Sequence, residues 1–337
     1  MQFYDVCNGD ADGLIARHQF RLSFPVLPSR LTLITGAKRE IALLSRVNVH
    51  DVANNGAAND RPNGTAINVF DISYDQNAES AQRLLEAGAA IRYFDHHRAS
   101  QLQPHPRLEV HINTSAHTCT SLIVDRYLNA AHRPWAIAAA FGDNLTKVAE
   151  QLAVDAKMSA AQTRLLRQLG ECINYNAYGE TCRDLHFPPE EIARRMLPYQ
   201  SPFEFAQCED ILPRLQTGFA ADLHLAQSIL PLHASKAVTA YVLPDEPWAR
   251  RISGTFANML VRTNPQRAHA VLSFSADSAY TVSIRAPLDN PQHAYAVAIQ
   301  FNNGGGRAAA AGINNLAPHE ITRLVSLLEA TYGVVYG

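Results

Sequence analysis

The stretch AAIRYFDHHR, residues 89–98, decides the fold. Its first part, from Ala89 to Phe94, is an apolar run of the kind that forms a buried strand. The run ends abruptly in Asp95, His96 and His97. A strand that served only stability would have no reason to finish in an acid and two imidazoles. Because open α/β sheets place their ligands at the carboxyl ends of the strands, we expect these side chains at the mouth of a functional cleft.

Aspartates also end other apolar runs, at Asp10 and Asp12, at Asp71 and at Asp143. Each acid has an ordinary explanation on its own, since an acidic turn is common and Asp12 could simply cap a helix that begins near Gly13. Gathered at one sheet edge, however, these carboxylates would repel one another unless a cation lay between them. Carboxylates with one or two imidazoles and no sulfur suit Mn²⁺ or Mg²⁺ better than a structural zinc. The set therefore predicts a divalent-metal site.

Strand-like and helical segments alternate over the first part of the chain, with strands expected at 2–7, 31–35, 66–71 and 91–94. This rhythm is typical of a parallel sheet with helices on both faces. From about residue 114 the pattern becomes helical.

A change back to strand-like segments near Ala237 indicates a second domain. We expect an α/β domain with a parallel sheet and flanking helices over 1–195, a helical connector over 196–235, and a smaller mixed α/β domain over 236–337. The length of 337 residues agrees with two domains.

Composition limits the classes of function. The formal net charge of −2 argues against a dedicated binder of long duplexes, but it leaves room for a small anionic substrate. The five cysteines are scattered and contain no CxxC pair, so a disulfide framework or a thiolate zinc site is not expected. The N-terminus does not resemble a secretory signal, and no apolar run is long enough to cross a bilayer. We expect a cytoplasmic protein without a membrane partner.

A glycine-rich segment stands out in the second domain, where Gly304, Gly305 and Gly306 precede Arg307. Three glycines leave backbone N–H groups open to an anion, and we expect a helix to begin just after them. The forked guanidinium of Arg307 suits a phosphate, and Arg285 is a second candidate cation. A flexible glycine turn and an ordinary exposed arginine are the alternative interpretations.

The chain resembles the DHH phosphoesterase superfamily. The segments 8–13, 70–73, 95–97 and 142–143 are similar to motifs one to four of that superfamily, and 304–312 resembles the glycine-rich signature of the DHH-associated C-terminal domain. Their order and approximate spacing agree over nearly the whole chain. The superfamily includes RecJ-like exonucleases, nano-RNase and pAp phosphatases, cyclic dinucleotide phosphodiesterases and family II inorganic pyrophosphatases. The chain looks most similar to a branch often labelled exopolyphosphatase-like.

The resemblance implies a centre that holds two Mn²⁺ ions, for which Mg²⁺ or Co²⁺ could substitute. Asp10 and Asp12 would each serve a different ion, and Asp71 would bridge the two. His96 would ligate one ion, and Asp143 would complete the other.

The resemblance also implies roles around the substrate. His97 would face the substrate phosphate, as a hydrogen-bond donor or as an acid for the leaving oxygen, and Asp95 would orient the histidine pair. Arg285, Arg307 and the glycines 304–306 would close over the substrate from the second domain.

Two positions depart from the pattern of the superfamily. Asn8 stands where many relatives have His or Asp, so one metal is expected to be held more weakly there or through water. Arg307 stands where the signature commonly has His, which exchanges a titratable donor for a fixed cation.

These features predict an Mn²⁺-dependent phosphoric ester hydrolase. It would cleave short single-stranded oligonucleotides or small nucleotides such as pAp by means of a hydroxide held between two metal ions. Hydrolysis of pyrophosphate or polyphosphate is one alternative. A non-catalytic metal-binding or nucleotide-binding module is another, although the presence of all five expected metal ligands counts against it. A homodimer is compatible with these expectations.

Overall fold

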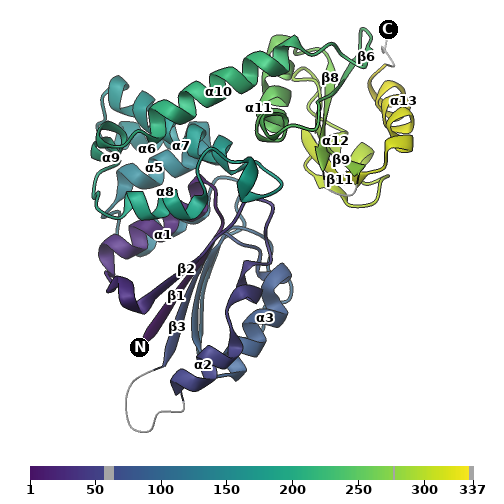
Figure 1. Ribbon diagram of the computed structural model, residues 1–337. Helices are drawn as coiled ribbons and strands as arrows, with labels where there is room; N and C mark the ends of the chain where they lie inside the picture. Colours follow the sequence, from purple (N-terminus) through teal and green to yellow (C-terminus); the bar gives the residue numbers. More distant parts are fainter. Residues whose placement is uncertain (57–63, 276–277, 334–337) are drawn as a thin grey trace. The chain divides into compact units, whose positions relative to one another are not determined.

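A computed structural model of the protein describes residues 1–56, 64–275 and 278–333 (Figure 1). The chain forms two compact units, Met1–Gln216 and Thr217–Gly337. The division between them falls inside helix α10 (Ile211–Ser228) and inside the segment 196–235 that was expected to be a helical connector. Each unit has its own sheet and its own hydrophobic core.

The first unit is built on a five-stranded sheet in which every neighbouring pair is parallel. Its strand order is β2-β1-β3-β4-β5. The strands are β1 (Gln2–Cys7), β2 (Leu31–Ile34), β3 (Thr65–Phe70), β4 (Ala90–Asp95) and β5 (Leu108–Ile112). Side chains of the central strands are buried on both faces, which explains their nearly continuous apolar runs. The predicted α/β class with a parallel sheet is confirmed.

Helices cover both faces of this sheet (Figure 1). One face packs on α2 (Val49–Gly56) and α3 (Tyr74–Glu86), with Tyr93 in the core between sheet and helices. The other face turns Phe94 toward a larger helical layer. That layer contains α1 (Ala11–Ser23), α4 (Thr120–Tyr127), α5 (Arg133–Gly142), α6 (Thr146–Asp155), α7 (Ala160–Ala177), α8 (Pro189–Met196) and α9 (Pro202–Cys208).

A buried ion-pair cluster fixes α1 on the sheet. The carboxylate of Asp5, on β1, accepts hydrogen bonds from Arg17 Nε at 3.0 Å and from Arg21 Nε at 2.7 Å. Asn68 of β3 donates to the same carboxylate at 3.2 Å. Because each charge in such a cluster would be costly to bury alone, the helix and two strands are held in one register. This register sets the position of Asp10, at the start of α1.

The second unit contains a six-stranded mixed sheet in the order β10-β11-β9-β8-β7-β6. Its β7–β8 pair is parallel, and its other pairs are antiparallel. The strands are β6 (His233–Ala234), β7 (Val238–Val242), β8 (Ala268–Ser275), β9 (Ala279–Arg285), β10 (Gly304–Gly306) and β11 (Ala310–Leu316). The helices are α11 (Pro247–Thr263), α12 (Ala294–Ala298) and α13 (Ile321–Tyr332). The predicted mixed α/β character is confirmed.

The prediction of a helix just after the glycines 304–306 is wrong. These glycines form β10, and the chain returns as β11, which pairs with β9. A Cβ at Gly304 would lie 1.8 Å from the Ala298 carbonyl oxygen, and Gly306 has φ +135°. The glycines therefore allow close packing on α12 and a turn. Pairing along β9 outweighs the helix propensity of the alanines that follow.

Short 3-10 turns lie at Pro28–Arg30, Leu43–Arg46, Cys182–Asp184 and Pro318–Glu320. Among the helices in the described part of the chain, none has the length and hydrophobicity that crossing a bilayer requires.

Candidate metal centre

Acids that are distant along the chain converge at the carboxyl edge of the parallel sheet. Two groups of side chains offer ligand atoms that lie within 4.8 Å of one another. One group is Asp12, His96 and Asp143, and the other is Asp71, His96 and His97. Asp12 follows β1, Asp71 follows β3, and His96 follows β4, whereas Asp143 comes directly after α5.

Asp10 caps α1. Its Oδ1 accepts the backbone N–H of Gly13 at 3.0 Å, which satisfies one of the unpaired donors of the first helical turn. A Cβ on Gly13 would lie 2.4 Å from the Asn8 carbonyl oxygen, so the turn can close this tightly only with glycine. The tight turn places Asp10 and Asp12 at the same sheet edge.

The N-terminus of α4 holds two of the acids. The backbone N–H groups of Thr120 and Ser121 each donate to the carboxylate of Asp12 at 2.7 Å. The Thr120 hydroxyl donates to Asp71 Oδ1 at 3.0 Å. These supports were not predicted from the sequence, although two hydroxyl residues at the start of a predicted helix were a usable signal.

His96 has a defined ring orientation. Its Nδ1 lies 3.3 Å from the Thr118 carbonyl oxygen, which can only accept, so Nδ1 carries the proton. Its Nε2 lies 3.4 Å from Asp71 Oδ1. A ring nitrogen that faces a site while the other one is anchored by backbone is the usual arrangement of a metal-binding histidine.

Asp95 is buried against both histidines. Its Oδ1 accepts the backbone N–H of His96 at 2.8 Å and lies 2.7 Å from His97 Nδ1. The His97 side chain is 45% exposed, whereas Asp95 is fully buried. Because a carboxylate only accepts, His97 donates through Nδ1 and keeps Nε2 for another partner.

The centre carries more negative charge than its buried surroundings stabilise. Burial and the charges of Asp12 and Asp10 raise the pKa of Asp71 well above its usual range. Burial and Asp12 raise the pKa of Asp143 to about 6. Burial alone would lower the pKa of His96, but its hydrogen bond and charge interaction with Asp71 raise it to about 10. A divalent cation would relieve these repulsions, and the oxygen-rich donor set fits such an ion.

Lys38 also belongs to the centre, although it was not predicted from the sequence. Its Nζ lies 2.5 Å from Asp10 Oδ2. Burial opposes the charged lysine, but the charge of Asp10 keeps the pKa of Lys38 well above its usual range. Lys38 follows β2, whose carboxyl end lies at the same sheet edge, so its place after a predicted strand was a usable signal.

Asn8 is buried beside this lysine, and its Nδ2 donates to the Lys38 carbonyl oxygen at 3.4 Å. In the second unit, the backbones of Arg285 and Arg307 lie on opposite sides of β11, next to Ala310. Ala310 is the register partner of Arg285 and accepts the backbone N–H of Arg307 at 2.7 Å. Arg307 is exposed, and Arg285 Nε donates to Asn258 at 2.7 Å.

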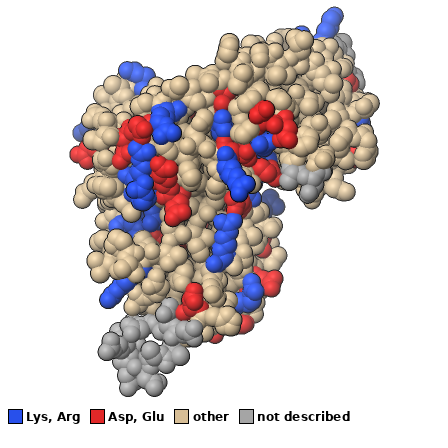
Figure 2. Space-filling view, in the orientation of Figure 1, with Lys and Arg blue, Asp and Glu red and all other residues tan. Residues whose placement is uncertain are grey.

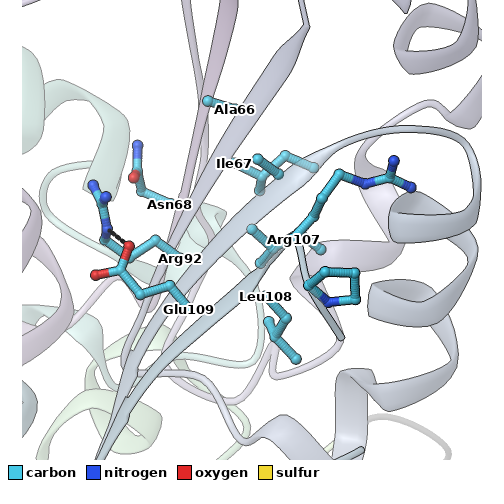
Figure 3. A pocket seen from close by; sticks show the side chains of 10 residues that line it. Ala66, Ile67, Asn68, Arg92, Arg107, Leu108 and Glu109 are labelled. Atoms are coloured by element: carbon cyan, nitrogen blue, oxygen red, sulfur yellow. Dashed lines mark hydrogen bonds and ion pairs between the residues drawn. The ribbon is translucent and has the colours of Figure 1, made fainter. Parts of the chain in front are cut away.

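A pocket of about 270 Å³ lies elsewhere, at the amino-terminal halves of β3, β4 and β5 (Figure 3). Arg92 and Glu109 line it and form an ion pair at 2.7 Å. This pocket is at the opposite end of the strands from the metal centre, so it contributes nothing to the chemistry described here.

No protein-family model and no curated protein sequence matches the chain. Solved structures do match. Exonuclease RecJ bound to manganese has a TM-score of 0.60 and 14% identity, covering 99% of this chain and 90% of that one. The DHH domain of a protein assigned to a family of ribosomal proteins has a TM-score of 0.64 and 13% identity, covering 98% and 86%.

RecJ from Thermus thermophilus, in complex with Mn²⁺, has a TM-score of 0.59 and 16% identity, covering 98% of this chain and 52% of that one. At these identities the likeness shows the fold alone. The chain shares its fold with these RecJ and DHH-domain structures.

Proposed function

We propose that the protein is a divalent-metal-dependent phosphoesterase that hydrolyses phosphoester bonds of short oligonucleotides or small nucleotides. The observation that carries this proposal is the convergence of Asp12, Asp71, His96 and Asp143 at a largely buried place. These four residues would hold the cation. Bound there, a divalent ion lowers the pKa of water and neutralises charge on the phosphoryl oxygens. Similarity to RecJ structures that contain Mn²⁺ supports manganese as the ion.

His97 is the candidate for proton transfer in this proposal. Its Nδ1 is engaged by buried Asp95, which fixes the orientation of the ring. The half-exposed ring can then present a proton at Nε2 to a leaving oxygen. Such a hydrogen-bonded pair of acid and imidazole is a common solution for acid catalysis.

Charge distribution supports a short substrate. The net charge is −2, and on the face drawn in Figure 2 basic and acidic side chains intermingle. A long nucleic acid would need many aligned cations, whereas a small phosphate needs only a few. We include Arg285 and Arg307 in the proposal as phosphate-binding cations. A cytoplasmic location also belongs to it, because all five cysteines are free thiols.

A substrate panel with Mn²⁺ tests the proposal. It should contain short RNAs, short DNAs, pAp, cyclic dinucleotides, polyphosphate and pyrophosphate. We expect turnover of a short oligonucleotide or small nucleotide, and its loss in Asp71→Asn with the fold retained. If the protein hydrolyses only polyphosphate or pyrophosphate, the proposed nucleotide substrates are wrong and the protein is a polyphosphate or pyrophosphate hydrolase. Inactivity on every compound would contradict the enzymatic function.

A further inference from the structure

Lys38 is held at the metal centre by a closely packed loop. Its backbone N–H donates to the Ala177 carbonyl oxygen at 3.0 Å, and its carbonyl oxygen accepts from Asn8. A Cβ on Gly9 would lie 1.9 Å from the Gly36 carbonyl oxygen. The glycine thus allows the loop of Lys38 to lie directly against the turn that carries the first acids.

The ammonium group of Lys38 is held by several partners. Besides Asp10 Oδ2 at 2.5 Å, the Lys38 Nζ donates to Asn174 Oδ1 at 3.0 Å. It also lies 5.1 Å from the centroid of the Tyr178 ring, within the range of a cation–π interaction. Three different partners from two segments of the chain fix this charge, and the side chain is only 24% exposed.

The two groups of candidate metal ligands, which are Asp12, His96 and Asp143 and then Asp71, His96 and His97, share one ligand. Both contain His96, whose Nδ1 faces the Thr118 carbonyl oxygen, so only Nε2 is available to a metal. One imidazole nitrogen binds one ion, because it has a single lone pair. Asp12, His96 and Asp143, with Asp71 beside them, can therefore surround a single cation.

In the two-ion centre expected from sequence, the second ion would bind Asp10. Within the described residues, Asp10 belongs to no group of three acidic, imidazole or thiol ligands. Its Oδ1 accepts from Gly13, and its Oδ2 accepts from Lys38.

Two further neighbours of Asp10 could help to hold that ion. Asp71 interacts with Asp10 but also stands beside the first ion position. Asn8 offers an Oδ1 that has no hydrogen-bond partner in the described part of the chain, but it brings no charge. Paired ions lie about 3.5–4 Å apart, so an ion on Asp10 would compete with the ammonium for one place.

We propose that this centre holds one divalent cation, and that the Lys38 ammonium, on Asp10, supplies the second positive charge of the site. The inference rests on the proposed metal dependence but differs from the two-ion centre expected from sequence. In this arrangement the Lys38 ammonium stabilises negative charge on the substrate phosphoryl group. Unlike a bound metal ion, this charge is part of the chain and cannot dissociate into solvent.

Metal stoichiometry tests the inference directly. The full chain is stripped of metal, dialysed against Mn²⁺ at several concentrations, and analysed for bound manganese and by electron paramagnetic resonance. We expect one Mn²⁺ per chain and the spectrum of an isolated ion. Two ions per chain with an exchange-coupled spectrum would overturn the inference while leaving the proposed function standing. Absence of any bound manganese would contradict both.

Variants of Lys38 give an independent readout. Lys38→Met removes the charge at similar length, so Asp10, Asp71 and the Asn8 oxygen become available, and we expect a second Mn²⁺ to bind. Lys38→Arg retains the cation and should stay at one. If Lys38→Met also stays at one while folded, as judged by circular dichroism, the lysine does not exclude a second ion. If that variant does not fold, Lys38→Gln serves in its place, and the wild-type stoichiometry decides the question by itself.

Discussion

His97 Nδ1 lies 2.7 Å from Oδ1 of Asp95, a carboxylate that is fully buried and also accepts the His96 backbone N–H. The half-exposed imidazole is thus positioned by an acid that solvent does not reach. Asp95 therefore positions the proposed proton donor, His97, and the backbone of the proposed metal ligand, His96, through one oxygen.

Replacing His97 by Gln should lower turnover about 10²–10⁴-fold, the usual contribution of a positioned acid or base. Mn²⁺ binding should change little, because Asp12, Asp71 and Asp143 remain. Steady-state kinetics and metal titration measure the two effects separately. His233→Gln is a matched control, since His233 also pairs with a carboxylate, Glu329 at 2.6 Å, but in the second unit. Equal losses in both variants would remove the catalytic role of His97.

Thr120→Val should weaken Mn²⁺ binding about 10–100-fold, as expected when a group that orients a metal ligand is lost. The Thr120 hydroxyl donates to Asp71 at 3.0 Å, and valine keeps the shape but not the donor. Thr120→Ser retains the hydroxyl and should bind nearly as the wild type does. Isothermal titration calorimetry gives the affinities. Unchanged binding in Thr120→Val would show that Asp71 needs no such support.

Metal affinity should rise with pH. The pKa of His96 is raised to about 10, so its ring is protonated at neutral pH and must lose that proton when Nε2 binds a metal. The pKa of Asp143 is raised to about 6, so a further proton competes below that pH. Titrations in buffers of different ionisation enthalpy should show about one proton released per ion at neutral pH and more in mild acid. No proton release at neutral pH would place the metal away from His96.

His18 should make folding stability depend on acid. Burial lowers its pKa to about 3, and its Nε2 lies 2.9 Å from the Tyr199 carbonyl oxygen. The unfolded chain takes up a proton near pH 6.5 while the folded chain does not, so this residue's contribution to stability falls as pH drops from about 6.5 toward about 3. Between about pH 7 and pH 5 the loss is about 2 kcal/mol.

Urea unfolding at those two pH values gives the free energy of unfolding of the wild type and of His18→Gln. The comparison separates the pH dependence due to His18 from that due to the acidic centre. The difference between the two pH values should be smaller in the variant. If both proteins lose equal stability, His18 is protonated in the folded state.

The main sheet and most of the centre were predictable because strand ends carry their own signal. An apolar run that stops at Asp71 or at Asp95 predicts both a buried strand and the position of its carboxyl end. Parallel pairing then brings these ends together whatever the intervening sequence. In the structure Asp12, His96 and Asp143 offer ligand atoms within 4.8 Å of one another, and Asp71 does so with His96 and His97. Asp143 comes from the end of helix α5, and its role as a metal ligand stays a prediction.

Two features depend on tertiary contacts that local sequence patterns do not specify. Lys38 reaches Asp10 only because Gly9 and Gly36 approach closely, and neither glycine forms a recognisable pattern with the lysine. The glycines 304–306 suggested the start of a helix, but the alanines that follow them lead into β11, which pairs with the edge of β9. In both cases packing decided what local propensity could not.

Anomalous scattering from a crystal grown with Mn²⁺ tests the central claim most directly. We expect an anomalous peak within bonding distance of Asp12, His96 and Asp143, beside Asp71. A crystal with no such peak at saturating Mn²⁺, or with manganese bound only elsewhere, would contradict it.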